Sequence, residues 1–258
     1  MTGPSSRLVG ARRRWSAAAL GALAVALATP TQGCTSPEGE GTARGGLDSP
    51  PCWQGPFDLA PDFFGTAPYR DSAMFRIQRS SDNQTFSDGI SLVVEDLTRV
   101  QKALGAKLLV TLPPEVTAPG VPVKPEADPG IVHLSLYLQK SCKTQTTTLH
   151  AVREVSFAPD TAAGGCDAAD EGQDPACANP VPGARGDGKS RIVFHSIFRG
   201  DTTTLDAEAR RTRGCFDVYL ANPREIDPVT LAPPRCRGHL RGTFDFLYRR
   251  SRPSQQFP

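Results

Sequence analysis

The sequence predicts a mainly β fold, an antiparallel β-sandwich or barrel-like domain with one or two short helices and stabilising disulfides. Three observations indicate this. Short segments alternate apolar and polar residues with a period of two, which is the pattern of half-buried strands. Turn-forming residues separate these segments, without the regular strand and helix alternation of parallel-sheet proteins. The 258 residues include seven cysteines, and 38% of them are hydrophobic, which is enough for an ordinary interior.

The first segment of the folded part, residues 52–70, is rich in proline, glycine and aromatic residues and has no regular period. We expect it to cross the domain as an irregular segment that covers an edge, because its residues favour turns while its aromatic side chains favour burial. An aromatic platform for a ligand is the alternative. The aromatic side chains concerned are Trp53, Phe57, Phe63 and Phe64.

Strands are predicted next. Phe75 and Ile77 alternate with polar residues, and residues 90–94 resume the same period after a turn signal. Another strand at 107–112 precedes residues 113–130, which contain six prolines. Because proline cannot donate to a regular ladder, this last stretch is predicted to be a surface connector.

Two short helices are predicted between the strands. Asp96 can cap the first, because apolar residues follow it at helical spacing until Gly105. Residues 206–211 favour one or two further helical turns.

The second half of the chain contains the clearest strand pattern, at residues 131–140, with a hairpin partner at 146–157. Residues 158–189 then form a long loop that breaks the period. Three further strands are predicted at 191–198, 216–220 and 240–248.

The N-terminal segment has the three parts of an export signal: a cationic start, an apolar run at residues 15–28, and small or polar residues up to Cys34. The apolar run is shorter than the roughly 20 residues that a membrane-spanning helix needs, so we expect removal rather than retention. Cleavage after Ala28 would release a secreted protein beginning at Thr29. The cationic residues are Arg7, Arg12, Arg13 and Arg14.

Gly33 followed by Cys34 resembles the lipobox of bacterial lipoproteins, in which a dedicated peptidase cuts before a cysteine that carries diacylglycerol. This chain has Thr31 and Gln32 where members of that family usually have leucine and a small residue. The resemblance implies lipidation of Cys34 and attachment to a membrane through that lipid.

The predicted organisation has three parts. The signal peptide covers residues 1–33, and residues 34–51 lack a core-forming pattern, so we expect them to be a flexible tether. Residues 52–258 are predicted to form a single β-rich domain.

Assigning Cys34 to lipid leaves six cysteines, an even number suited to disulfides in an oxidising compartment. A short loop closes easily, which favours one local pair, and two cysteines that each precede a strand favour a second. Other connectivities stay open. The pairs that we expect are Cys52 with Cys142, Cys166 with Cys177, and Cys215 with Cys236.

The long loop offers carboxylates of the kind that calcium prefers, but their spacing differs from an EF-hand, so a solvated loop is predicted. Among the histidines, His195 is predicted to be a buried core residue and the other three surface residues, without zinc-ligand spacing. The carboxylates are Asp167, Asp170, Glu171 and Asp174, and the other histidines are His133, His150 and His239.

The sequence contains no nucleophile, P-loop or dinucleotide-binding motif, so no catalytic residue, metal ligand or cofactor is predicted. The formal net charge is +2, and it becomes −2 without the four arginines of the export segment. Because there is no basic field, a nucleic-acid partner is not expected.

The ending RGHLRGTFDFLYRR, with Gly238 and Gly242 on either side of Leu240, resembles the closing strand of lipoproteins of high-GC Gram-negative bacteria. This resemblance implies a cell-envelope location and no particular activity. Thr35 is not the aspartate that retains lipoproteins at the inner membrane in some bacteria, which favours the outer membrane. We therefore expect a non-catalytic outer-membrane lipoprotein with a binding or structural role toward an envelope protein or ligand. The alternative is a secreted hydrolase that carries a metal site.

Overall fold

The computed structural model describes residues 39–79, 87–113, 130–142, 147–157, 166, 177, 187–199, 210–227, 230 and 232–248. Over these residues, eleven strands belong to one sheet, in which every strand pair is antiparallel. The mainly β, antiparallel fold predicted from the sequence is confirmed.

The first strands lie in the half of the chain before the long loop. They are β1 (Gly39–Ser49), β2 (Trp53–Asp58), β3 (Phe63–Tyr69), β4 (Ser72–Gln78), β5 (Gly89–Val94), β6 (Leu108–Leu109), β7 (Val132–Leu138) and β8 (Thr147–Ala151). The remaining strands are β9 (Arg191–Ser196), β10 (Arg211–Ala221) and β11 (Gly238–Leu247). Two short helices accompany them, α1 (Leu97–Lys102) and the 3-10 helix η3 (Pro223–Glu225).

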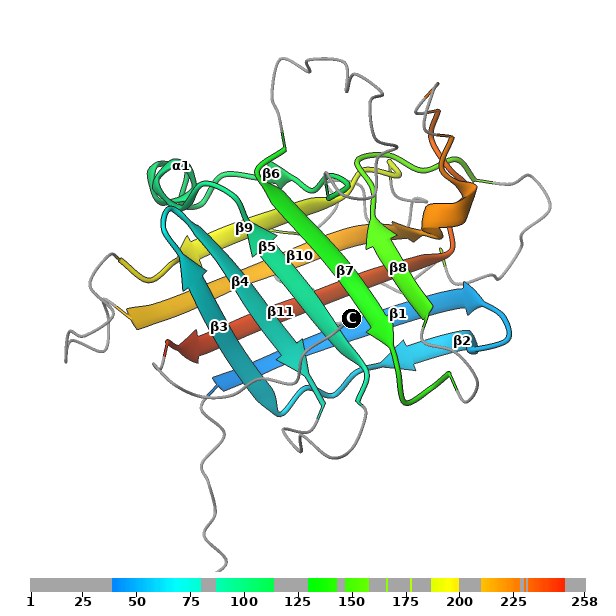
Figure 1. The fold of residues 1–258 in the computed structure, drawn as a ribbon, viewed down its shortest axis with the longest axis horizontal. Helices are drawn as coiled ribbons and strands as arrows, with labels where there is room; N and C mark the ends of the chain where they lie inside the picture. Colours follow the sequence, from blue (N-terminus) through cyan, green and yellow to red (C-terminus); the bar gives the residue numbers. More distant parts are fainter. Residues whose placement is uncertain are drawn as a thin grey trace, which may run out of the picture. The chain divides into compact units, whose positions relative to one another are not determined.

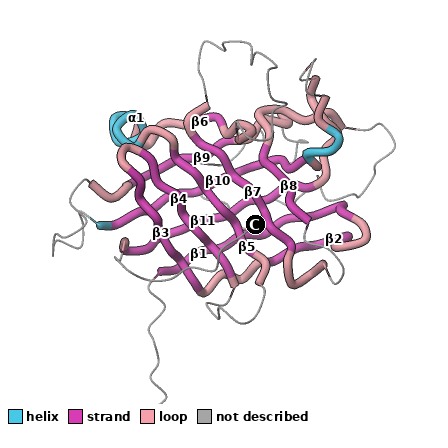
Figure 2. The backbone as a smooth tube through the Cα atoms, in the orientation of Figure 1, coloured by secondary structure: helices cyan, strands magenta, loops and turns pink. Residues whose placement is uncertain are grey.

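The sheet folds into two layers that cross. Its hydrogen-bonded order is β2-β1-β11-β10-β8-β7-β5-β4-β3, and β9 pairs with both β10 and β6. Figure 1 shows β3, β4, β5, β7 and β8 running diagonally across the other five long strands, and Figure 2 shows the same crossing of the backbone. This is the orthogonal arrangement in which one sheet bends over to pack against itself.

β10 joins the two layers. Its first half pairs with β9, whereas Leu220 and Ala221 at its end pair with β8. A second connection runs through residues that follow β6, because the Val110 N–H donates to the Ser190 carbonyl at 3.1 Å and the Thr111 N–H donates to the Val132 carbonyl at 3.0 Å. The layers are therefore tied by backbone hydrogen bonds at two places.

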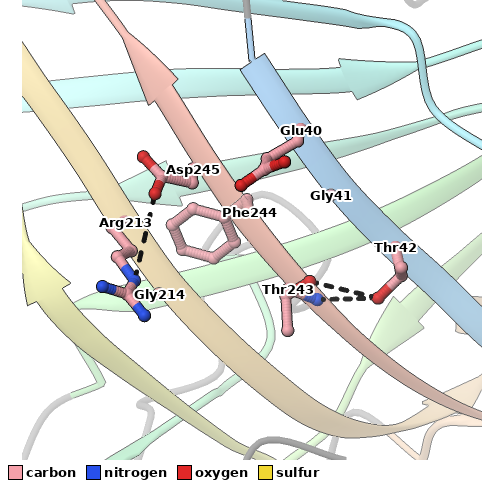
Figure 3. A pocket seen from close by; sticks show the side chains of 8 residues that line it. All are labelled: Glu40, Gly41, Thr42, Arg213, Gly214, Thr243, Phe244 and Asp245. Atoms are coloured by element: carbon pink, nitrogen blue, oxygen red, sulfur yellow. Dashed lines mark hydrogen bonds and ion pairs between the residues drawn. The ribbon is translucent and has the colours of Figure 1, made fainter. Parts of the chain in front are cut away.

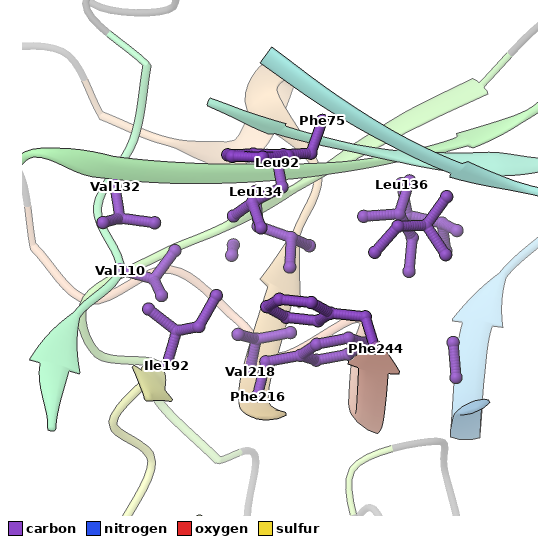
Figure 4. Close-up of a cluster of buried hydrophobic side chains, with 14 of the residues drawn as sticks. Phe75, Leu92, Val110, Val132, Leu134, Leu136, Ile192, Phe216, Val218 and Phe244 are labelled. Atoms are coloured by element: carbon purple, nitrogen blue, oxygen red, sulfur yellow. The ribbon is translucent and has the colours of Figure 1, made fainter. Parts of the chain in front are cut away.

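The core lies between the two layers, where the inward residues of each strand alternate with outward ones. Figure 4 shows side chains of one layer, such as Leu134 and Leu136, facing Phe216, Val218 and Phe244 of the other. All five are at most 1% exposed. Burying large apolar side chains in this way contributes about 1.5–3 kcal/mol each, so this interface is the main source of stability.

The expectation of a flexible tether over residues 34–51 is wrong for residues 39–49. They form β1, which pairs with β11 over nine positions from Gly39↔Phe246 to Leu47↔Gly238, and with β2 on its other side. The physical reason is that glycine occupies inward positions of β1, where the ring of Phe64 fills the space. A Cβ atom on Gly41 would stand 3.1 Å from that ring.

Residues 52–70 contain two regular strands rather than one irregular segment. β2 and β3 are the two ends of the sheet order, so each has a neighbour on one side. The expected burial of the aromatic side chains is correct for Phe57, Phe63 and Phe64, all below 5% exposed, whereas Trp53 is partly buried against the core.

The predicted helix after Asp96 is confirmed as α1. The Asp96 carboxylate accepts a hydrogen bond from the Arg99 N–H at 2.8 Å, which is the usual N-cap contact. Gly105 adopts a φ of +79°, a left-handed conformation that favours glycine after a helix. The other predicted helix, at 206–211, lies mostly outside the described residues, and Arg211 begins β10.

Three disulfides connect the six cysteines of the domain. Cys52–Cys142 is as predicted, but the other two bonds are Cys166–Cys236 and Cys177–Cys215. The predicted bond between Cys215 and Cys236 is wrong because Cys215 lies opposite Thr243 while Leu220 lies opposite Gly238. Five residues of strand, roughly 17 Å, therefore separate the two cysteines along the sheet, beyond disulfide reach.

Candidate functional site

A recess opens on the outward face of the layer formed by β1, β2, β9, β10 and β11, across β1, β11 and β10. Its volume is about 360 Å³, and Figure 3 shows the side chains that line it. Cross-strand pairing produces this arrangement, because outward residues of neighbouring strands stand side by side. The lining residues are Glu40, Gly41, Thr42, Arg213, Gly214, Thr243, Phe244 and Asp245.

Three charged side chains form one row of the recess. Glu40 of β1 and Arg213 of β10 both lie opposite Asp245 of the intervening β11. The Arg213 Nε atom is 4.0 Å from an Asp245 carboxylate oxygen.

Arg211 already neutralises Asp245. Its Nε and Nη2 atoms donate to the two carboxylate oxygens at 2.9 and 2.6 Å, a bidentate pair with good geometry. Arg213 lies farther away and its side chain is 55% exposed. Glu40 is exposed and forms no hydrogen bond or ion pair within the described structure. The recess therefore offers one guanidinium and one carboxylate for a ligand.

The next row of the recess is uncharged. The hydroxyl oxygens of Thr42 and Thr243 are 3.2 Å apart, and the Thr243 N–H donates to the Thr42 hydroxyl at 3.3 Å. Cys215 continues this row and is fully buried. The Cys177–Cys215 disulfide thus lies one strand away from the hydroxyl row.

A second polar group lies farther along β10 and β11, and its side chains are buried. The His239 Nε2 atom is 2.5 Å from an Asp217 oxygen, and the Arg241 Nε atom is 3.4 Å from the other. The Tyr219 ring stacks on the His239 ring with centroids 4.1 Å apart. Tyr219, His239 and Asp217 are all at most 5% exposed, so this group holds the sheet together rather than meeting a ligand.

Burial determines the protonation of Tyr219. It raises the pKa of the phenol above its ordinary value, and the nearby Asp217 carboxylate raises the pKa further. Arg241 and an N–H from Gly188 lower the pKa by smaller amounts. The neutral phenol is therefore strongly favoured in the folded protein.

A third polar group forms a row across the outward side of the other layer, which consists of β3, β4, β5, β7 and β8. Arg76, Ser91, Ser135 and His150 are successive cross-strand neighbours on β4, β5, β7 and β8. The Ser135 hydroxyl is 2.8 Å from the His150 Nδ1 atom. These two residues are 5% and 8% exposed, and burial lowers the pKa of Arg76.

The histidine predictions were wrong in detail. His195 is half-buried, while the three histidines predicted at the surface are at most 8% exposed. His133 is held by the Thr111 carbonyl, 3.0 Å from its Nδ1 atom, and by Glu95, 3.5 Å from its Nε2 atom. Alternation in the sequence gives the side of the sheet on which a residue lies, not whether that side is covered.

Cys34 and the four carboxylates of the long loop lie outside the described residues. In the part of the chain that is described, no three His, Cys, Asp or Glu side chains are grouped to hold a metal ion. No helix of that part is long and apolar enough to span a membrane.

The recess has no signal in the sequence pattern. Its strand β1 was predicted to be a tether, so the pairing of Glu40 with Asp245 had no basis in the sequence pattern. No protein-family model matches the chain, and searches of curated proteins and of solved structures found no match.

Proposed function

We propose that this chain is a lipid-anchored, non-catalytic protein of the bacterial cell envelope, whose β domain binds a polar ligand in the recess around Glu40 and Arg213. The cysteine pairing is the observation that supports the anchor most directly. Six of the seven cysteines form three disulfides, which leaves Cys34, at the end of the export-like segment, as the remaining cysteine. Disulfides form and persist outside the cytoplasm, so an envelope or secreted location fits this pairing.

Exposure supports binding over catalysis. The charged groups of the recess are open to solvent, whereas the side chains of the Ser135–His150 and Asp217–His239 pairs are almost fully buried. A hydrolase needs its nucleophile within reach of a substrate. An open, polar recess with two unlike charges instead suits recognition of a small polar group.

Acylation of Cys34 is tested by growing cells that produce the full chain with labelled fatty acid. We expect label on the wild type and on Thr35→Ala, no label on Cys34→Ala, and recovery of the labelled protein at the density of the outer membrane. Absence of label, or label that survives Cys34→Ala, would overturn the anchor. Label at inner-membrane density would overturn the outer-membrane location alone.

The 2.8 Å contact between Ser135 and His150 supports a hydrolase as the second candidate function. An activated serine reacts with fluorophosphonate probes. Labelling of the wild type that is lost in Ser135→Ala would favour the hydrolase, and the proposal of a non-catalytic protein expects no labelling.

A further inference from the structure

The position of β1 limits how far the domain can stand from a lipid on Cys34. Only residues 35–38 separate Cys34 from Gly39, the first residue of β1. An extended chain spans at most about 3.6 Å per residue, so the two Cα atoms are within about 18 Å of each other. The strand is held in the sheet, because residues 39–47 pair with β11, residues 44–49 also pair with β2, and Ala43 and Leu47 lie in the core.

The recess lies at this end of the domain. Glu40 directly follows Gly39, and Arg213 and Asp245 occupy the same cross-strand row as Glu40. Figure 1 shows the start of β1 and β10 and the end of β11 at the same end of the layer. By contrast, the far end of β1, an eleven-residue strand, is about 33 Å farther along the sheet. A lipid anchor therefore keeps the recess near the membrane surface.

The chemistry of the recess matches a group that carries both signs of charge. With Asp245 paired to Arg211, the side chains available to a ligand are the guanidinium of Arg213 and the carboxylate of Glu40. A guanidinium favours a phosphate, to which it can donate two hydrogen bonds. A carboxylate favours an ammonium that can donate hydrogen bonds. The volume of about 360 Å³ is at the small end for ligand sites, which suits a headgroup.

We propose that the recess binds the headgroup of a phospholipid with a phosphate and a primary ammonium, in the membrane surface to which Cys34 attaches the chain. This inference rests on the proposed lipid anchor. Arg213 binds the phosphate, Glu40 binds the ammonium, and the hydroxyls of Thr42 and Thr243 lie beside them. The domain is thereby held to the membrane at two points, which fixes its orientation.

The test uses the full mature chain from residue 34 with Cys34→Ser, so that no acyl chain contributes, and measures flotation with vesicles. We expect binding to vesicles of phosphatidylethanolamine mixed equally with phosphatidylcholine, and weak binding to phosphatidylcholine alone. Glu40→Gln and Arg213→Gln should each weaken the binding about tenfold, as expected for loss of one charge-assisted contact. The matched controls Glu154→Gln and Arg44→Gln, which change exposed charges outside the recess, should leave it unchanged.

Three results would overturn the proposal. Equal binding to both kinds of vesicle would show no headgroup recognition, and equal losses in the controls would show a general charge effect. Competition by inorganic phosphate as strong as that by phosphoethanolamine would show a phosphate site without an ammonium subsite. Because flotation uses an unacylated chain and the labelling experiment does not involve Glu40 or Arg213, failure of the headgroup site and failure of the lipid anchor are distinguishable.

Discussion

Removal of the Cys177–Cys215 disulfide should lower the free energy of unfolding by about 4 kcal/mol. The two cysteines are 38 residues apart in the sequence, and the loop-closure relation for disulfides converts that separation into about 3.9 kcal/mol at 25 °C. Both cysteines pack with Val193 and are at most 2% exposed, so replacing either of them with alanine also removes a small amount of packing contact. The value is a large fraction of the stability of an ordinary domain.

The decisive comparison is between single and double variants. Cys177→Ala, Cys215→Ala and the double variant should all lose about the same free energy, because each removes the same bond. Urea unfolding of the non-reduced chain at mildly acidic pH, which suppresses thiol exchange, measures the difference. If the double variant lost the sum of the two single losses, the cysteines would belong to different disulfides and the observed pairing would be wrong.

Three further predictions concern other parts of the domain. The raised pKa of Tyr219 means that the folded state binds this proton more tightly than the unfolded state does. The free energy of unfolding should therefore fall as pH rises above about 10, by up to about 1.4 kcal/mol per pH unit. Urea unfolding of Tyr219→Phe should show a smaller decrease with pH. Gly242→Ala should cost about 1–3 kcal/mol in thermal unfolding, because a Cβ atom there would overlap the Thr42 carbonyl oxygen and the Phe216 ring; an unchanged melting temperature would contradict this. Asp88→Ala should cost about 1–3 kcal/mol in urea unfolding, because it removes the acceptor for two backbone N–H groups and the Ser141 hydroxyl; a loss below 0.5 kcal/mol, or roughly the scatter of surface variants, would contradict this.

The sequence contains enough information for the strands whose inward residues are apolar. β7 is an example, since Leu134, Leu136 and Leu138 alternate with polar residues and all three are fully buried. The N-cap of α1 was equally accessible, because Asp96 stands directly before residues with helical spacing. In these elements the local pattern and the tertiary environment agree.

β1 shows why the rest was not predictable. Its inward positions include Gly39, Gly41 and Gly45, which give no apolar alternation, and the sequence GEGTARGGLDS resembles a linker. The aromatic ring of Phe64, from β3, packs where Gly39 and Gly41 have no side chain, and the backbone of His239 lies where a side chain on Gly45 would begin. Such a contact between distant segments leaves no local signal, and tertiary packing overrides the propensity of the segment.

The recess and the disulfides depend on the same long-range information. The opposition of Glu40, Asp245 and Arg213 requires the register of three strands that are far apart in the sequence. The distance between Cys215 and Cys236 follows from the pairing of β10 with β11 and not from their spacing in the chain. Loop length favoured a bond between Cys166 and Cys177, whereas the structure pairs these cysteines with Cys236 and Cys215.

The intact mass of the mature protein from its native membrane fraction, before and after reduction and thiol alkylation, tests the central claim most directly. The account predicts a chain that begins at Cys34 and carries acyl groups, with six thiols that react only after reduction. A chain that begins at Thr29 without acyl groups, or thiols that react before reduction, would contradict it.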